Sequence, residues 1–148
     1  MICAVRGNSQ EDFDRVNVTG TKNVLDAIAA QPAPPKLLHL SSIVAREPDL
    51  SYYSRSKRRG EDLVTENPAL EWTVIRPPAV YGVGDTEMLP IFRAMSRGIV
   101  TVPGSPEART SLIEISDVVA AIIACMNSAG ARGGIFEIAD PQRHGYSW

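Results

Sequence analysis

The pattern of hydrophobic and polar residues predicts a chain of alternating helices and strands. Residues 9–12 form a capping box, and behind it apolar residues recur with a helical period as far as the proline-rich stretch at 32–35. The apolar run at 36–40 predicts a buried strand, residues 53–66 predict an amphipathic helix, and residues 72–75 predict a second strand.

The second half of the chain has a less regular pattern. It predicts a short amphipathic helix at 88–97 closed by Gly98, an extended segment at 99–102, a helix at 117–126 and a last strand at 135–139. Strands that alternate with helices in this way are typical of an α/β protein with a parallel sheet.

The candidate chemistry lies where the first strand ends and the next helix begins. Tyr53 and Lys57 are four residues apart, so they share one face of the predicted helix. A free phenol has a pKa of about 10, and a nearby ammonium favours the phenolate, which makes tyrosine a usable proton carrier. Ser42 ends the strand before this helix, and its hydroxyl can orient a substrate oxygen. Ligands of open α/β sheets bind at this edge.

Alone, a tyrosine and a lysine on one helix face are weak evidence, because exposed helices carry such pairs without function. Three further segments change this. In order they are Asn17-Val18-Thr19-Gly20-Thr21, the run from Arg76 to Asp85, and the run from Ile113 to Val118. With Ser42 and Tyr53-x-x-x-Lys57, this ordered set resembles the extended short-chain dehydrogenase/reductase family of the NAD(P)-dependent epimerase/dehydratase type, over nearly the whole chain.

The resemblance implies a partial Rossmann-like, doubly wound parallel sheet with a small C-terminal substrate-side region. Residues 1–85 are expected to form the C-terminal half of the Rossmann-like domain, with the catalytic serine, tyrosine and lysine. Residues 86–148 are expected to form the substrate-side region together with a returning helix and strand.

The resemblance also implies roles for individual residues. Tyr53 resembles the catalytic acid/base, and Lys57 the lysine that holds the nicotinamide ribose and lowers the pKa of the tyrosine. Ser42 matches the substrate-orienting serine, whereas Ser41 comes one residue too early and is expected to form hydrogen bonds at the strand end.

Other matched positions have weaker implications. Asn17 resembles a helix asparagine that supports a water relay to the lysine, but an asparagine bonded to local backbone is an equal alternative. Pro77 and Val80 fall where the main chain of the family contacts the nicotinamide. His39 has no catalytic partner, so it is expected to be a satisfied structural histidine.

A glycine-rich dinucleotide-binding turn, G-x-G-x-x-G or G-x-x-G-x-x-G, does not occur after any predicted strand. Such a turn holds the pyrophosphate of NAD or NADP. We therefore expect that the first half of the fold is missing, and that the isolated chain is inactive unless a homodimer or a partner chain supplies that half. The alternative is a truncated or binding protein that keeps the fold without the chemistry.

Two departures from the family pattern concern the substrate. Nucleotide-sugar members usually carry an asparagine where Ala79 stands and an arginine near Thr110, although Arg109 could compensate for the second. A less polar secondary alcohol or ketone is therefore as consistent with the sequence as a sugar nucleotide. These residues do not separate epimerase, dehydratase and dehydrogenase, or NAD from NADP.

Composition limits the size of the core, the kinds of partner and the cellular location that the sequence predicts. The 148 residues are 44% hydrophobic with a net charge of −2, enough for one core. The basic run 55–59 lacks interleaved aromatic residues, so we expect a solvated surface rather than a nucleic-acid site. Cys3 and Cys125 have no partners at metal-ligand spacing, which predicts no metal site and reduced thiols in the cytoplasm. No apolar run predicts a signal peptide or a membrane span.

Overall fold

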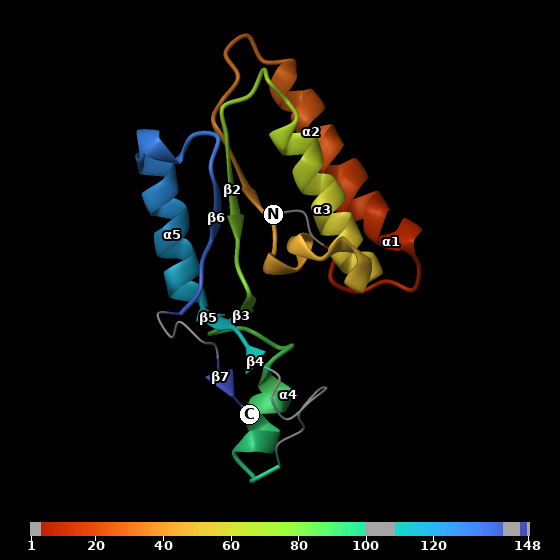
Figure 1. Ribbon diagram of the computed structural model, residues 1–148, viewed down its shortest axis with the longest axis vertical. Helices are drawn as coiled ribbons and strands as arrows, with labels where there is room; N and C mark the ends of the chain where they lie inside the picture. The colour runs from red at the N-terminus through yellow and green to blue at the C-terminus, as the bar shows by residue number, and fades with distance from the viewer. Residues whose placement is uncertain (1–3, 100–108, 141–145, 148) are drawn as a thin grey trace.

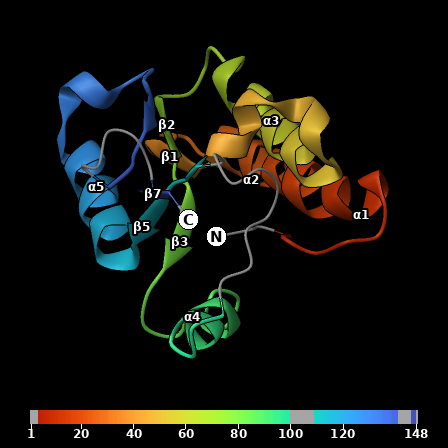
Figure 2. The same cartoon turned by 60° about the horizontal axis from the view of Figure 1, so that its bottom comes forward.

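A parallel three-stranded sheet forms the centre of the molecule. The computed structural model describes residues 4–99, 109–140 and 146–147, so most of the extended segment expected at 99–102 lies outside it. The sheet has the order β1 (Leu37–Leu40), β2 (Trp72–Arg76), β6 (Ile135–Glu137). The helices α2 (Gly20–Ala29) and α3 (Tyr52–Thr65) cover one face, and α5 (Ile115–Asn127) covers the other (Figures 1 and 2). The predicted α/β class with a partial doubly wound sheet is confirmed.

The first predicted helix contains a turn that its sequence pattern did not indicate. Ser9 caps α1 (Gln10–Asp14) through its side chain, and the Asp12 carboxylate accepts the Ser9 amide, as the capping box predicts. A π-helical turn at Arg15–Thr19 then joins α1 to α2. A π turn holds one extra residue, so it changes which side chains face the sheet, and such turns occur frequently at functional sites.

The π turn packs directly against α3 at Gly60. A Cβ atom on Gly60 would lie 2.6 Å from the backbone oxygen of Asn17, which also accepts a 2.7 Å hydrogen bond from the Thr21 hydroxyl. Only a residue without a side chain lets the two helices approach this closely.

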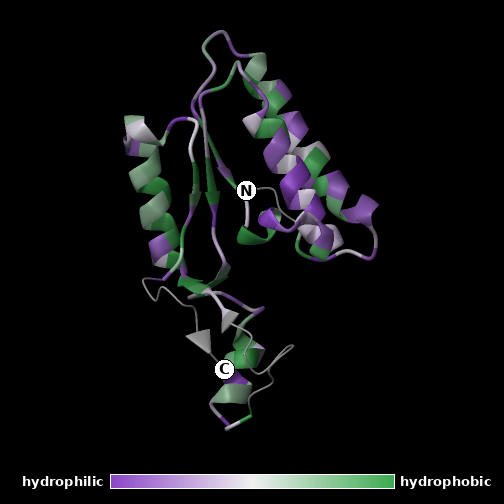
Figure 3. Cartoon of the chain, in the orientation of Figure 1, coloured by the Kyte–Doolittle hydropathy of each residue, from purple (hydrophilic) through white to green (hydrophobic). Residues whose placement is uncertain are grey.

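The core lies between the sheet and the helices α2 and α3. Its buried members are Leu25, Val64, Leu70 and Val74, with Leu37 packed against them at the edge. In Figure 3 the strands β2 and β6 are largely hydrophobic, and α1–α3 alternate between hydrophilic and hydrophobic residues, as expected for helices that cover a sheet with one face.

A second, smaller group of elements lies beyond the carboxyl ends of the sheet strands (Figure 1). It contains a parallel pair, β3 (Ala79–Tyr81) with β5 (Leu112–Glu114), an antiparallel pair, β4 (Arg109–Thr110) with β7 (Tyr146–Ser147), and α4 (Leu89–Met95). Three short 3₁₀ turns, Ile43–Arg46, Pro48–Leu50 and Ala129–Ala131, complete the described elements. The sequence did not predict the strands of these two pairs, because two or three residues show no periodicity. The equally short β6 was predicted because it lies within the longer, mostly apolar run at 135–139.

The returning helix and strand expected within residues 86–148 are α5 and β6, because β6 pairs with β2 in the main sheet. The helix expected at 88–97 is shorter, Leu89–Met95, and Gly98 follows it with a φ of +76°. The boundary between the two expected parts, at residue 85, stays a prediction.

The Gly60→Ala substitution should destabilise the fold by about 1–3 kcal/mol, because the added methyl group meets backbone rather than a flexible side chain. The matched control is Gly130→Ala, whose Cβ would find nothing closer than the Ser128 hydroxyl at 3.7 Å. The control should change stability by less than about 0.5 kcal/mol. Urea unfolding measures both, and equal midpoints for the two variants would contradict the proposed close contact.

Candidate functional site

The candidate site is built where β1 ends and α3 begins. Ser41 and Ser42 directly follow β1, and Ser42 has an extended backbone with a φ of −157° before the 3₁₀ turn at Ile43–Arg46. Ser51 caps α3 by accepting the Ser54 amide at 3.0 Å. The cap fixes the first turn of α3, which carries Tyr53, and Lys57 follows one turn later.

Lys57 is held at the end of β1. Its side chain is buried, at 4% exposure, and its Nζ donates a 2.9 Å hydrogen bond to the carbonyl of Leu40. Burying an ammonium is costly unless it is hydrogen-bonded, so this contact fixes the charge beside Ser41 and Ser42. Its position depends on both β1 and α3.

Tyr53 is positioned by the first helix. Its ring is half-buried and packs against Phe13 of α1, with 6.0 Å between the ring centroids and 56° between the ring planes. Tilted aromatic pairs of this kind add to the stability gained from burial alone. Lys57 is thus bonded at the end of β1, two residues before Ser42, and Tyr53 lies one turn earlier on the same helix. The catalytic roles of Tyr53, Lys57 and Ser42 stay predictions.

Asn17 joins the start of the described chain to α3. Its Oδ1 accepts the Ala4 amide at 2.8 Å, and its Nδ2 donates to the Ala4 carbonyl at 3.1 Å and to the Ser56 hydroxyl at 2.9 Å. Ser56 in turn donates to the carbonyl of Tyr53 at 2.8 Å. These bonds reach Ala4, 13 residues away, and a side chain of α3, so they differ from the expected bonds to local backbone. A part for Asn17 in a water relay stays a prediction.

A buried ion pair that the sequence reasoning missed lies one helical turn beyond Lys57. Arg76 donates to both oxygens of Glu61, at 2.5 and 3.0 Å, and the two side chains are 13% and 2% exposed. Arg76 also bonds Glu137 of β6 at 3.1 Å, so the network spans from α3 across β2 to β6. The only sequence signal was an acidic residue four positions after the lysine and an arginine just before Pro77.

The ion pair sets the charge of Glu61. Burial would raise the pKa of this carboxyl, but the hydrogen bonds and the positive charge of Arg76 outweigh burial and hold the pKa below its ordinary value. Glu61 is therefore ionised at neutral pH.

His39 lies in β1, close to Lys57 and Glu61. Burial, reinforced by the charge of Lys57 and opposed by that of Glu61, lowers the pKa of His39 to about 4. It is uncharged at neutral pH, as a structural histidine should be. Its Nε2, however, is buried without a hydrogen-bond partner among the described residues, contrary to the expectation that it is satisfied.

The loop after β2 touches the loop after β1. The carbonyl of Pro77 accepts the amide of Ile43 at 2.9 Å, and Val80 lies in β3, opposite Ile113 of β5. Pro77 and Val80 therefore lie beyond the sheet edge that carries Ser42, and their contact with a cofactor stays a prediction. The side chain of Arg109 lies outside the described residues.

The basic run is neutralised within the chain. Arg55, Arg58 and Arg59 form ion pairs with Asp49, Asp62 and Asp14. The three arginines are partly exposed, as expected of a solvated surface, whereas Lys57 of the same run is buried. Among the described residues, no cluster of His, Cys, Asp or Glu side chains has the arrangement of a metal site. In the same part of the chain, no helix has the length and apolar character needed to cross a bilayer.

Comparison with known proteins identifies the family. The model of the NAD dependent epimerase/dehydratase family matches residues 3–139. The chain belongs to this family. Its members are enzymes that use NAD or NADP, which agrees with the resemblance drawn from the motifs.

One curated relative is the ceramide reductase of Caulobacter vibrioides (strain NA1000 / CB15N). It is 37% identical over 145 residues, which are 97% of this chain and 44% of the relative. The chain therefore spans less than half the length of that relative.

Solved structures share the fold. The terminal R domain from the myxalamid PKS-NRPS biosynthetic pathway has a TM-score of 0.78 and 22% identity, over 95% of this chain and 42% of that one. UDP-glucuronic acid 4-epimerase from Bacillus cereus, in complex with NAD, has a TM-score of 0.77 and 18% identity, over 95% and 51%. A human epimerase family protein solved with NADPH has a TM-score of 0.75 and 19% identity, over 94% and 52%.

The Glu61→Gln substitution should cost about 3 kcal/mol of stability, because it leaves the buried Arg76 charge without its main partner. The control is Glu87→Gln, which removes the exposed Arg6–Glu87 pair, whose side chains are 78% and 57% exposed. The effect of Glu87→Gln on the free energy of unfolding should lie within experimental error. Denaturant unfolding at pH 7 distinguishes the two, and an equally mild effect of both would show that the Glu61–Arg76 pair is not buried.

Stability should fall as the pH drops from 6.5 toward 4. The folded pKa of His39, about 4, lies below its ordinary value of 6.5, so the unfolded chain binds a proton that the folded chain excludes. The free energy of unfolding is therefore highest above pH 6.5, and about 2 kcal/mol of it should be lost by pH 5 as the unfolded chain binds the proton. The free energy of unfolding, measured at pH 6.5 and at pH 5, should differ less between the two pH values in His39→Leu than in the parent chain. Equal pH dependence in the variant and the parent chain would contradict this.

Proposed function

We propose that this chain is the catalytic part of an NAD(P)-dependent oxidoreductase that interconverts a ketone and a secondary alcohol. The observation that carries the proposal is the position of Lys57, which is buried and bonded to the end of β1 one helical turn after Tyr53. A tyrosine beside a fixed positive charge, at the carboxyl edge of a parallel sheet, is suited to proton transfer at a bound substrate.

Each of the three residues has a distinct task in this proposal. The Tyr53 phenol gives a proton to the substrate oxygen in reduction and removes it in oxidation. The Lys57 ammonium stabilises the phenolate and binds the ribose beside the nicotinamide. The Ser42 hydroxyl donates a hydrogen bond to the substrate oxygen while charge develops there. When bound, NAD(P) supplies or accepts the hydride.

The residues present suit one end of the cofactor. Tyr53 and Lys57 offer hydrogen-bonding groups for the nicotinamide ribose, and the backbone near Pro77 and Val80 is close to the same edge. A glycine-rich turn, which would hold the pyrophosphate, occurs after none of the described strands. We therefore expect that the isolated chain has no measurable nicotinamide-dependent turnover.

The substrate we propose is a ketone with long apolar substituents. Helix α4 exposes four large hydrophobic side chains, those of Leu89, Ile91, Phe92 and Met95. The curated relative is named a ceramide reductase, which supports a lipid substrate and simple reduction. Ala79 lacks the side-chain amide that nucleotide-sugar members use at this position, which disfavours a nucleotide sugar, although the adjacent Arg109 carries the guanidinium that Thr110 lacks.

The test is a chimera in which this chain replaces the matched 145-residue segment of the Caulobacter relative. NADH and NADPH oxidation is followed with a ketone lipid and with a nucleotide sugar as substrates. Tyr53→Phe and Lys57→Met should each lower kcat by about 100-fold or more. Tyr52→Phe is the matched control, since Tyr52 is the adjacent residue on α3 and is 51% exposed.

Unchanged turnover in Tyr53→Phe would overturn the proposed role of Tyr53. A chimera that binds NADH but turns over no substrate would instead support the alternative, a protein that keeps the fold without the chemistry. Faster turnover of the nucleotide sugar than of the lipid would reject the proposed substrate class.

A further inference from the structure

The Ser42 turn, which consists of Ser42 and the 3₁₀ turn Ile43–Arg46, is tied to the sheet at both of its ends. Near its start, the Ile43 amide donates to the carbonyl of Pro77 at 2.9 Å. At its end, the Arg46 guanidinium donates to the Glu137 carboxylate at 3.0 Å. The turn therefore depends for its position on the residue that follows β2 and on the last residue of β6.

The Glu137 carboxylate is shared between two arginines. One of its oxygens accepts a hydrogen bond from Arg46 and the other accepts one from Arg76, at 3.0 and 3.1 Å. Arg76 lies opposite Glu137 in the β2–β6 pair, and its remaining nitrogens bind Glu61 of α3. Four charges of alternating sign thus connect the Ser42 turn to α3, and the guanidinium of Arg76 is at the centre of this network.

The contact between Arg46 and Glu137 differs from an ordinary surface ion pair. The two side chains are 53% and 35% exposed, and an isolated pair with this exposure adds little to stability. Here, however, Glu137 is already held by Arg76, which is 13% exposed. Only the side chain of Arg46 therefore loses freedom when the pair forms. The contact is suited to placing the Ser42 turn rather than to stabilising the fold.

We propose that Arg46 is a positioning residue, which holds the Ser42 turn in place relative to Tyr53. This inference rests on the proposed function, in which the Ser42 hydroxyl and the Tyr53 phenol act on the same substrate oxygen. Two groups that act on one atom must keep a fixed separation, and a displacement of about 1 Å can lower the rate about 100-fold. In this role Arg46 acts through Glu137 and not by contact with the substrate.

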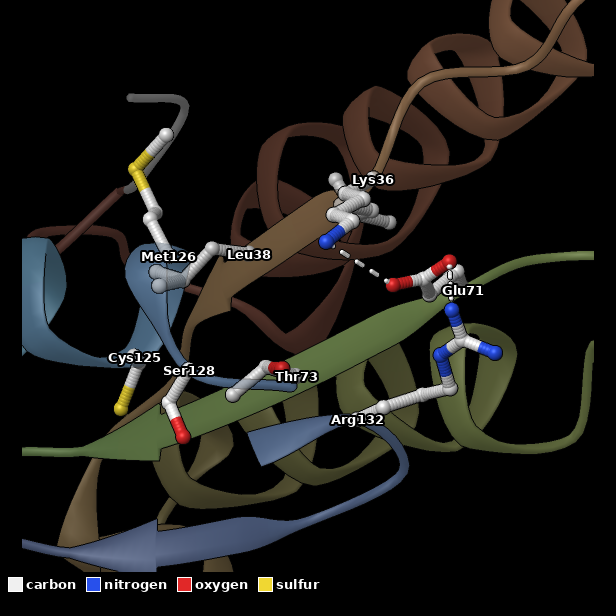
Figure 4. Close-up of a pocket in the computed structure, with 9 residues that line it drawn as sticks. Lys36, Leu38, Glu71, Thr73, Cys125, Met126, Ser128 and Arg132 are labelled. Atoms are coloured by element: carbon white, nitrogen blue, oxygen red, sulfur yellow. Dashed lines mark hydrogen bonds and ion pairs between the residues drawn. The ribbon is translucent and has the colours of Figure 1, made fainter. Parts of the chain in front are cut away.

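A second charge network, at the opposite end of the sheet, offers a matched control. Glu71 directly precedes β2, accepts a hydrogen bond from Arg132 at 2.6 Å and pairs with Lys36 at 3.3 Å (Figure 4). Its carboxylate is thus also shared by two cations. Arg132 and Glu71 are 64% and 29% exposed, which is close to the exposure of the proposed pair. The substitution Arg132→Met therefore removes an equivalent contact and leaves the Ser42 turn untouched.

The first measurement is amide hydrogen exchange in the full chain, which requires no activity. In Arg46→Met the Ile43 amide should exchange about tenfold faster, because the turn has lost one of its two anchors. The Ser41 amide, which donates to the carbonyl of Ile75 in β2 at 2.8 Å, is the internal reference and should not change. Arg46→Lys keeps the charge and should return the Ile43 rate to within about threefold of the parent chain. Arg132→Met should leave the Ile43 rate unchanged.

The second measurement is turnover in the chimera with the Caulobacter relative. Arg46→Met should lower kcat about tenfold and leave the KM for NADPH unchanged, because Lys57 and not Ser42 is proposed to bind the ribose. If Arg46 acts through Ser42, Arg46→Met should have no further effect on kcat once Ser42→Ala has been made. The melting temperatures of Arg46→Met and Arg132→Met should agree, so that stability does not explain their difference in kcat.

Unchanged exchange of the Ile43 amide in Arg46→Met would overturn the proposal, and so would an equal acceleration in Arg132→Met. Multiplying effects of Arg46→Met and Ser42→Ala on kcat would also overturn it, because Arg46 would then act elsewhere. Faster Ile43 exchange together with full turnover of the Ser42→Ala chimera would refute the proposed task of Ser42 and leave the turn held by Arg46. A chimera without turnover would count against the proposed function, while the exchange rates would still decide whether Arg46 holds the turn.

Discussion

The buried ion pair between Glu61 and Arg76 ties α3, the helix that carries Tyr53 and Lys57, to the sheet. It joins α3 to the end of β2, and Arg76 also donates a hydrogen bond to Glu137 of β6. Because Glu61 and Lys57 are one turn apart on α3, the pair also fixes where the lysine lies along the helix axis. The hydrogen bond from the Lys57 ammonium to the carbonyl of Leu40 then fixes the position of that charge. The arrangement of Tyr53, Lys57 and Ser42 depends on this contact between helix and sheet.

A second group of contacts holds the same helix from its other side. Phe13 packs on Tyr53, Asn17 bonds Ser56, and Gly60 lets the π turn approach the α3 backbone. The site is therefore rigid on the side of α1 and α2. On the opposite side of β1, none of the strands that the structure describes pairs with the sheet, and an apolar cavity of about 490 Å³ lies along β1. The contacts that fix the helix carrying Tyr53 and Lys57 therefore come mainly from the side of α1 and α2.

Local patterns predicted the large elements well. The capping box of Ser9, the strands at residues 36–40 and 72–75, and the helix that carries Tyr53 all lie within a residue or two of their observed bounds. They could be predicted because capping and periodicity act over a few neighbouring residues. The π turn was missed, since its extra residue shifts the apolar spacing by only one position, which a short helical pattern does not reveal. The pairs β3–β5 and β4–β7 were missed because such short strands are defined by their partners.

The sequence by itself determined the family, the fold class and the elements that carry Ser42, Tyr53 and Lys57, because these follow from motif order and from strand and helix ends. Tertiary structure alone decided the charge and environment of the site. Glu61 and Arg76 are 15 positions apart, and Arg76 and Glu137 are 61 apart. The neutral state of His39 depends on burial that only folding creates. Contacts between distant residues and the loss of water around them depend on the packed fold, and a local sequence pattern contains neither.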